Sequence, residues 1–182
     1  MAKIIYVDGP DNAGKTSLIR DICEISDRYE LIDFPKRTDD GRFDIKSRNE
    51  VACFETMLEY LDPKKIYLLD RGYISNWVYG MIRGELLKEL DRFEVDFNRL
   101  VDNHKVYTLI LTRNEMTSDF EDDLISLSPE GFNKVISLFE EFADNQDLPV
   151  HQILNHDGRN NIRGVNAGEH QAVISSIIKW AK

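Results

Sequence analysis

The stretch GPDNAGKT, residues 9–16, matches the pattern G-x-x-x-x-G-K-[ST] in full. Its glycines let the backbone fold back so that consecutive N–H groups point at phosphate oxygens. In this pattern Lys15 reaches the β- and γ-phosphates, and the Thr16 hydroxyl binds Mg²⁺. The stretch stands between an apolar run at residues 4–7 and a helical stripe that starts at Lys15, which is the strand-loop-helix context that the motif requires. It therefore predicts an α/β fold that binds a nucleoside triphosphate.

Short apolar runs alternate with helical periodicity along the rest of the chain. Strands are expected at residues 4–7, 30–34, 66–69, 106–111 and 150–154, and helices at 51–61, 75–100, 129–142 and 172–180, the second of these being two helices broken near Gly80 or Gly84. Strands that are apolar on both faces are typical of a parallel sheet covered by helices on both sides. We expect a five-stranded parallel sheet in one domain spanning residues 1–182, with ligands at the carboxyl ends of the strands.

The charge balance restricts the partners of the chain. Its 182 residues include 33 Asp and Glu against 23 Lys and Arg, a net charge of −10. Such a surface repels a polyphosphate backbone and an anionic membrane, so we expect neither nucleic acid nor membrane as a partner. A small anion is still compatible where a few basic residues converge. The two cysteines are too few for a disulfide framework, and the N-terminal residues show no signal peptide, which favours a cytoplasmic protein.

The phosphate loop alone does not say what is done with the triphosphate. A regulatory GTPase needs a guanine-reading N-K-x-D motif, but Asn133-Lys134 lies inside an amphipathic helical pattern and has no Asp two residues on. A motor or translocase should be larger or more basic. The small size therefore favours a kinase that acts on a small acceptor.

Three motifs point to the acceptor side. Asp11 is the third residue of the phosphate loop, the second strand ends in FPKR at residues 34–37, and the third strand ends in DRGYIS at residues 70–75. In order and spacing these motifs resemble the thymidylate kinase family, which shows G-x-D-x-x-G-K, F-P-x-R and D-R-Y-x-x-S at these places. The resemblance covers most of the chain and implies the P-loop kinase fold. The Asp-Arg pair is also shared with the related deoxynucleoside kinases.

The resemblance implies a role for each matching residue. Arg37 is similar to the arginine that grips the acceptor monophosphate, and Asp11 to the carboxylate that hydrogen-bonds the sugar 3′-hydroxyl. Asp70 and Arg71 are similar to the pair beside the transferred phosphoryl group, with Asp70 near Mg²⁺ and its water and Arg71 on phosphate. Each has a purely structural alternative: Asp70 as a helix cap, Arg37 as a solvated charge, and Phe54, a candidate for stacking on the acceptor base, as a core residue of its helical stripe.

The expected site is a set of residues from the loop and from the ends of the strands. The residues expected in catalysis are Lys15, Asp11, Asp70 and Arg71, and Mg²⁺ is expected at Thr16 and Asp70. ATP is expected at Gly9, Asn12, Ala13, Gly14, Lys15, Thr16, Ser17 and Arg113. The acceptor is expected at Asp11, Phe34, Arg37, Phe54, Arg71, Ser75, Tyr79 and Arg83.

The chain departs from the family pattern in three places. The family carries a phosphoryl-clamping arginine in the phosphate loop or in a lid after the fourth strand; here the loop position is Asn12, and the short lid region, about residues 113–128, holds only Arg113 and is otherwise acidic. Gly72 replaces the tyrosine of D-R-Y. Either Arg113 is the clamp, or Arg71 does more than usual, or the acceptor is not dTMP. Residues 155–161 stand, by position alone, where the family contacts the donor adenine.

The function that these observations favour is an ATP- and Mg²⁺-dependent kinase for a deoxynucleoside monophosphate, dTMP first. The main alternative is a deoxynucleoside kinase that phosphorylates an unphosphorylated 5′-hydroxyl. A polynucleotide 5′-hydroxyl kinase is opposed by the acidic balance, because a strand-binding channel should be basic. A non-catalytic nucleotide-binding switch is the remaining alternative. Small nucleotides are the expected partners, and the resemblance is compatible with a homodimer.

Overall fold

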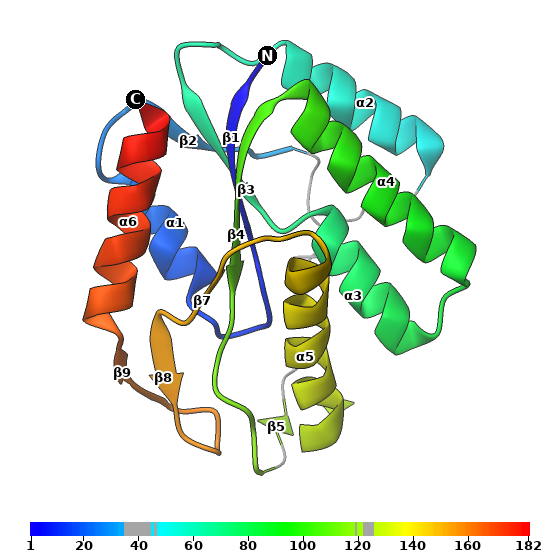
Figure 1. Cartoon of the computed structure of the whole chain (residues 1–182), viewed down its shortest axis with the longest axis vertical. Coiled ribbons are helices and arrows are strands. Elements are labelled where there is room, and N and C mark those ends of the chain that lie inside the picture. The colour runs from blue at the N-terminus through cyan, green and yellow to red at the C-terminus, as the bar shows by residue number, and fades with distance from the viewer. Residues whose placement is uncertain (35–44, 46, 119, 122–125) are drawn as a thin grey trace.

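The computed structural model describes residues 1–34, 45, 47–118, 120–121 and 126–182. At its centre is a five-stranded sheet in which every paired strand is parallel to its neighbour (Figure 1). The order is β2-β3-β1-β4-β7, and the strands are β1 (Lys3–Asp8), β2 (Tyr29–Leu31), β3 (Ile66–Asp70), β4 (Lys105–Leu111) and β7 (Val150–His151). The predicted five-stranded parallel sheet is confirmed. The strand order reverses at β1, and in open α/β sheets ligands bind at such a switch point.

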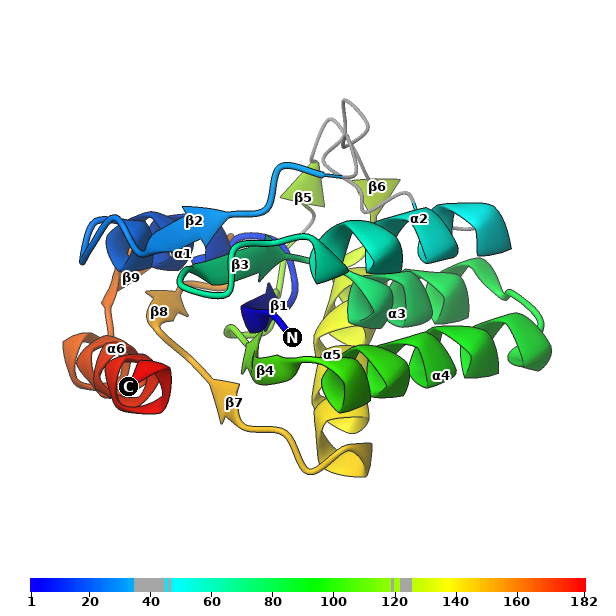
Figure 2. The ribbon, with the colours of Figure 1, turned by 90° about the horizontal axis from the view of Figure 1, so that it is seen from above.

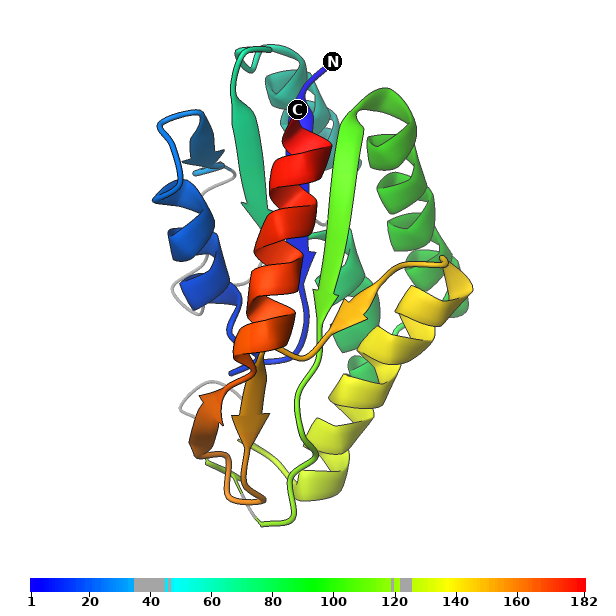
Figure 3. The same ribbon diagram turned by 60° about the vertical axis from the view of Figure 1, so that its left-hand side comes forward.

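Helices cover both faces of the sheet, as predicted (Figure 2). One face packs against α1 (Lys15–Cys23) and α6 (Ala167–Ala181), and Figure 3 shows α6 lying along the strands. The other face packs against α2 (Arg48–Glu59), α3 (Tyr73–Arg83), α4 (Leu87–Asn103) and α5 (Pro129–Asn145). The central strand serves both layers, since Ile5 and Val7 of β1 lie in the first layer while Ile4 and Tyr6 lie in the second. This explains why its sequence is a continuous apolar run.

Local signals set where the helices begin and end. The predicted pair of helices over 75–100 is broken at Gly84, the second of the two expected positions, where φ is +69° and glycine carries no steric cost. The last helix begins earlier than the predicted residue 172, because the Asn166 side chain accepts a hydrogen bond from Glu169 N and caps it there. None of the described helices combines the length and apolar character that a membrane crossing requires.

The predicted fifth strand over 150–154 is wrong in its extent. Only Val150–His151 pairs with β4, and residues from Leu154 onward form a separate antiparallel hairpin, β8 (Leu154–His156) with β9 (Ile162–Val165), which the sequence did not suggest. All four residues of β9 are exposed, so their sequence carries little apolar alternation. A second short hairpin, β5 (Phe120–Glu121) with β6 (Ser126–Leu127), lies in the region expected to form the lid.

Candidate active site

The phosphate loop runs from the end of β1 to the start of α1, as the motif predicts. Gly9 has φ +145° and lies so close to β4 that a Cβ atom there would meet the Leu111 carbonyl oxygen at 2.4 Å. Gly14, with φ +95°, is the N-cap of α1 and has no side chain to accept from the first turn of the helix. The helix therefore offers N–H groups and the positive end of its dipole to an anion.

Lys15 lies buried beneath this loop. Its Nζ donates to the Gly9 and Pro10 carbonyl oxygens at 2.7 and 2.6 Å. Burial lowers the pKa of Lys15 to about 7, and the nearby charge of Arg71 acts in the same direction against the carboxylates around it. The ammonium group is therefore held by carbonyl dipoles and is poorly neutralised, which suits it to bind a phosphate oxygen.

Arg71 follows β3 directly and meets the phosphate loop. Its guanidinium forms an ion pair with the Asp11 carboxylate, and its backbone N–H donates to Val7 O at 2.8 Å. Burial alone raises the pKa of Asp11, but the charges of Arg71 and Lys15 outweigh it, so the pKa lies below its usual value.

Tyr79 lies beside Arg71; burial raises the pKa of Tyr79 to about 12, against the opposing effect of the Arg71 charge. Three of the four expected catalytic residues, Asp11, Lys15 and Arg71, thus lie together. The fourth, Asp70, is close enough for its charge to act on Lys15, whose pKa it raises.

Arg113 follows β4 and reaches the same loop from the other side. The side chain is only 3% exposed; Nη1 donates to the Asp11 backbone oxygen at 3.1 Å, and the guanidinium lies over the Phe132 ring, 5.0 Å from its centroid. Nη2 has no hydrogen-bond partner among the described residues. Burial lowers the pKa of Arg113 to about 10, against the attraction of Asp11. His156 is buried next to it, and the charge of Arg113 adds to the effect of burial in lowering the pKa of that imidazole.

The turn of the β8–β9 hairpin contacts both the phosphate loop and the start of the lid region. Asn12 Nδ2 donates to the backbone and side-chain oxygens of Asn160, each at 3.2 Å. The backbone N–H groups of Thr117 and Ser118 both donate to Gly158 O, at 3.0 and 3.1 Å. A Cβ atom at Gly158 would lie 1.9 Å from Thr117 Oγ1, so a side chain there would force Thr117 to move. The segment placed by position at the donor end of the site therefore does lie beside the phosphate loop.

Other expected site residues lie elsewhere. Phe54 is 2% exposed and packs against Phe34 and Tyr73 with ring centroids 6.0 and 6.3 Å apart, so this structure places it in the core, and its stacking on an acceptor base stays a prediction. Arg83 is exposed at the end of α3 and pairs with Glu85. Arg37 lies outside the described residues.

The residues around the loop fit Mg²⁺ of the kind that triphosphates bring. No group of three or more potential His, Cys, Asp or Glu ligands occurs in the described part of the chain, so a protein-only cation cage is absent there. Mg²⁺ keeps several waters and is bound by one or two protein oxygens together with substrate phosphates. Thr16, exposed in the first turn of α1, and Asp70, at the end of β3, are oxygen donors of that kind.

Solved structures identify the fold, whereas no protein-family model and no curated protein matches the sequence significantly. A thymidylate kinase from Candida albicans aligns over 100% of this chain and 94% of its own, with 16% identity and a TM-score of 0.59. The YorR protein of Bacillus subtilis, in complex with phosphorylated GDP, aligns over 97% and 96%, with 14% identity and a TM-score of 0.55. The chain has the thymidylate kinase fold. A thymidylate kinase from Ehrlichia chaffeensis agrees, with 19% identity over 100% of this chain and 99% of its own and a TM-score of 0.52.

Within this thymidylate kinase fold, sequence reasoning missed Asp8 as a residue of the site. Asp8 ends β1 immediately before Gly9 and is 0% exposed. Ser75, expected to touch the acceptor, is instead buried and donates from Oγ to Asp8 Oδ1 at 2.5 Å. An acidic residue that closes a fully apolar strand was the available signal, because a buried carboxylate needs several hydrogen-bond donors and so marks a place where backbone segments meet.

Proposed function

We propose that this chain is a kinase that transfers the γ-phosphoryl group of ATP to a deoxynucleoside monophosphate, with dTMP as the first candidate acceptor. One observation carries the proposal: Lys15, Asp11 and Arg71 lie together at the carboxyl ends of β1 and β3, beneath a phosphate loop and in the thymidylate kinase fold. Phosphoryl transfer depends on placing two anions in line and neutralising the group that moves. These residues supply charges for that purpose within a protein of net charge −10.

The proposed reaction forms one bond and breaks one. An oxygen of the acceptor phosphate attacks the γ-phosphorus, the bond to the bridging oxygen breaks, and the electron pair leaves with ADP. Lys15 exchanges the carbonyl oxygens of Gly9 and Pro10 for phosphate oxygens. Arg71 contacts the moving group, since a guanidinium suits bidentate contact with phosphate. Mg²⁺, held by Thr16 and Asp70, supplies further neutralisation of the phosphates when bound.

The donor and acceptor ends of the site follow from this arrangement. We place the donor base against the 155–161 segment and the donor phosphates within reach of Arg113, whose buried Nη2 has no hydrogen-bond partner among the described residues. We place the acceptor on the side of Tyr79 and Arg71, with Arg37 as its phosphate contact. Residues 1–182 then act as one nucleotide kinase domain with a short lid at about 113–128.

A coupled assay that detects ADP, run with Mg-ATP over a panel of nucleosides and nucleoside monophosphates, tests the proposal. We expect turnover with a deoxynucleoside monophosphate. Turnover only with an unphosphorylated nucleoside makes the chain a deoxynucleoside kinase, and tight ATP binding without turnover on any acceptor makes it a binding protein. Salt-dependent binding of single-stranded DNA would point to a polynucleotide kinase. Arg37→Ala should raise the monophosphate KM strongly and leave ATP affinity unchanged.

A further inference from the structure

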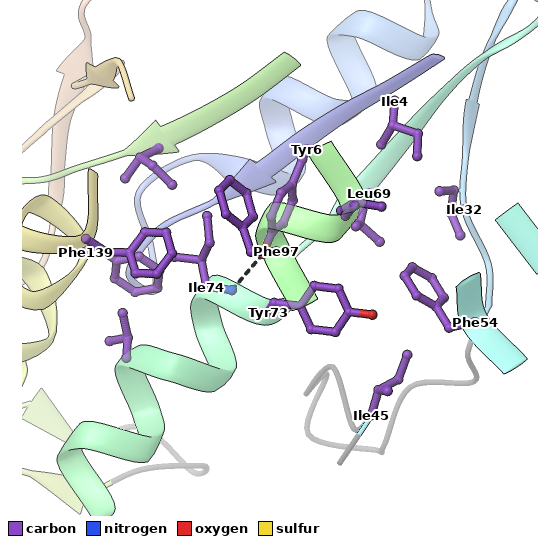
Figure 4. Packing of buried hydrophobic residues seen from close by; sticks show 14 of the residues in the cluster. Ile4, Tyr6, Ile32, Ile45, Phe54, Leu69, Tyr73, Ile74, Phe97 and Phe139 are labelled. Atoms are coloured by element: carbon purple, nitrogen blue, oxygen red, sulfur yellow. Dashed lines mark hydrogen bonds between the residues drawn. The ribbon is translucent and has the colours of Figure 1, made fainter. Parts of the chain in front are cut away.

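Helix α3 begins without a capping side chain of its own. Its N-cap is Gly72, yet the amides at its start are satisfied by two side chains of β1. Gly72 N and Ser75 N donate to Asp8 Oδ2 at 3.2 and 3.1 Å, and Ile74 N donates to the Tyr6 hydroxyl at 3.0 Å, the bond drawn in Figure 4. The central strand therefore supplies the cap that the helix lacks.

The same carboxylate also holds the phosphate loop. Asp8 Oδ1 accepts from Gly9 N at 2.9 Å, at the first residue of the loop, and Oδ2 accepts from the Tyr6 hydroxyl at 2.9 Å. Asp8 and Tyr6 are both 0% exposed. Both oxygens of Asp8 accept hydrogen bonds from protein donors and the side chain is shielded, so we assign it a positioning role.

Arg71 lies between the two ends of this network. It is a non-glycine residue with φ +65°, in the left-handed region, and such a conformation persists only where the surroundings fix it. Val7 O accepts its N–H on one side, and the amide of Gly72, the next residue, is fixed by Asp8 on the other. The guanidinium is thereby directed at Asp11 in the phosphate loop.

We propose that Tyr6 and Asp8 are positioning residues that hold Arg71 at the correct distance from the phosphate loop for phosphoryl transfer; this inference rests on the proposed function. Gly72 belongs to the same hydrogen-bonded network. A Cβ atom there would lie 2.7 Å from the Tyr6 hydroxyl oxygen and 2.9 Å from Cζ, so only glycine fits beside this tyrosine. Gly72 stands where the family motif has tyrosine, and the Tyr6 side chain leaves no room for a side chain there.

The test compares Tyr6→Phe with a matched control, Tyr67→Phe. Tyr67 is also a buried tyrosine of a central strand whose hydroxyl accepts a backbone amide, that of Asp62 at 3.1 Å, but it lies near the start of β3, away from the loop. We expect both variants to lower the melting temperature similarly, while only Tyr6→Phe lowers kcat, by about tenfold, with the KM for Mg-ATP within about twofold. Asp8→Asn should lower kcat further, by about 10²-fold. Equal kcat for Tyr6→Phe and Tyr67→Phe would overturn the inference.

A second readout separates this inference from the proposed function. In ¹⁵N-labelled protein, Tyr6→Phe should speed exchange of the Ile74 amide and shift the Arg71 guanidinium signal, whereas Tyr67→Phe should do neither. If the unsubstituted protein phosphorylates no acceptor, the proposed function fails, but these signals still report whether Arg71 is held in place. An Arg71 signal that does not move in Tyr6→Phe overturns the positioning role even where turnover is present.

Discussion

Two arginines follow the strands on either side of β1, and they contact Asp11 in different ways. Arg71, after β3, forms an ion pair with the Asp11 carboxylate, and although burial acts against it, that partner holds the pKa of Arg71 above its usual value. Arg113, after β4, meets Asp11 only at its backbone oxygen and also donates to the Asn114 backbone oxygen, and burial lowers the pKa of Arg113 to about 10. One cation is neutralised by the protein itself; the other is buried without a carboxylate partner in the described structure.

The difference indicates separate uses for the two charges. In the proposed reaction Arg71 exchanges Asp11 for a phosphate, so we expect its contribution to appear when both nucleotides are in place. Arg113 is already fixed, by Phe132 and by the loop backbone, with one guanidinium nitrogen left over. A fixed cation that lacks a counter-ion gains most from an arriving anion, because the cost of burying it is already met by the fold. Arg113 is thus a candidate for the clamp that the loop, with Asn12, does not provide.

Removal of Arg71 should give the largest effect. Arg71→Ala takes away the guanidinium that we propose contacts the transferred group, and we expect kcat to fall by about 10³-fold, in the range that arginines on a phosphoryl group contribute. Steady-state kinetics with saturating Mg-ATP measure it. Arg92→Ala, which removes an exposed arginine paired with Glu89 on α4, is the control and should keep the unsubstituted rate. Similar rates for the two variants would contradict the role of Arg71.

Removal of Arg113 should lower activity less than removal of Arg71, and it tests whether Arg113 is the phosphoryl-clamping arginine. We expect Arg113→Ala to lower kcat/KM for ATP by about 10²-fold, as loss of one charged donor to a developing phosphate charge does. Arg113→Lys keeps the charge and loses the planar contacts with Phe132 and the loop, so it should recover only part of the loss. An effect confined to the acceptor KM would instead assign Arg113 to the acceptor side.

Lys15 gives a third, pH-dependent effect. With a pKa of about 7 in the ligand-free protein, Lys15 loses its proton above neutral pH, while a bound triphosphate favours the ammonium form. Binding of Mg-ATP at pH 8 should therefore take up about one proton, and its Kd should rise by up to about tenfold per pH unit above 7. Calorimetry in buffers of different ionisation heat measures the uptake. Lys15→Arg stays charged and should abolish it; equal uptake in both proteins would assign the proton to another group.

The fold was predictable from local patterns because β1, β3 and β4 are apolar on both faces and the phosphate loop fixes one strand-loop-helix unit. The β8–β9 hairpin was not, since the exposed residues of β9 carry no apolar period and its place depends on backbone contacts such as those of Gly158. In the site, motif spacing predicted that Asp11, Lys15 and Arg71 converge. It did not predict that Asp8 links the loop to α3, because that contact joins residues 67 positions apart. Burial of Phe54 likewise depends on packing between helices and strands.

The smallest effect tests the comparison of the arginines directly, through stability. A double-mutant cycle of Asp11→Asn with Arg71→Ala should give a coupling of about 1 kcal/mol in the free energy of unfolding, because each side chain neutralises the other at a partly buried position. The cycle of Asp11→Asn with Arg113→Ala should be additive within about 0.5 kcal/mol, since Arg113 contacts a backbone oxygen that the substitution retains. Denaturant unfolding of the ligand-free proteins measures both cycles. Equal couplings would mean that Asp11 neutralises both arginines. The distinction between Arg71, which has a carboxylate partner, and Arg113, which has none in the described structure, would then fail.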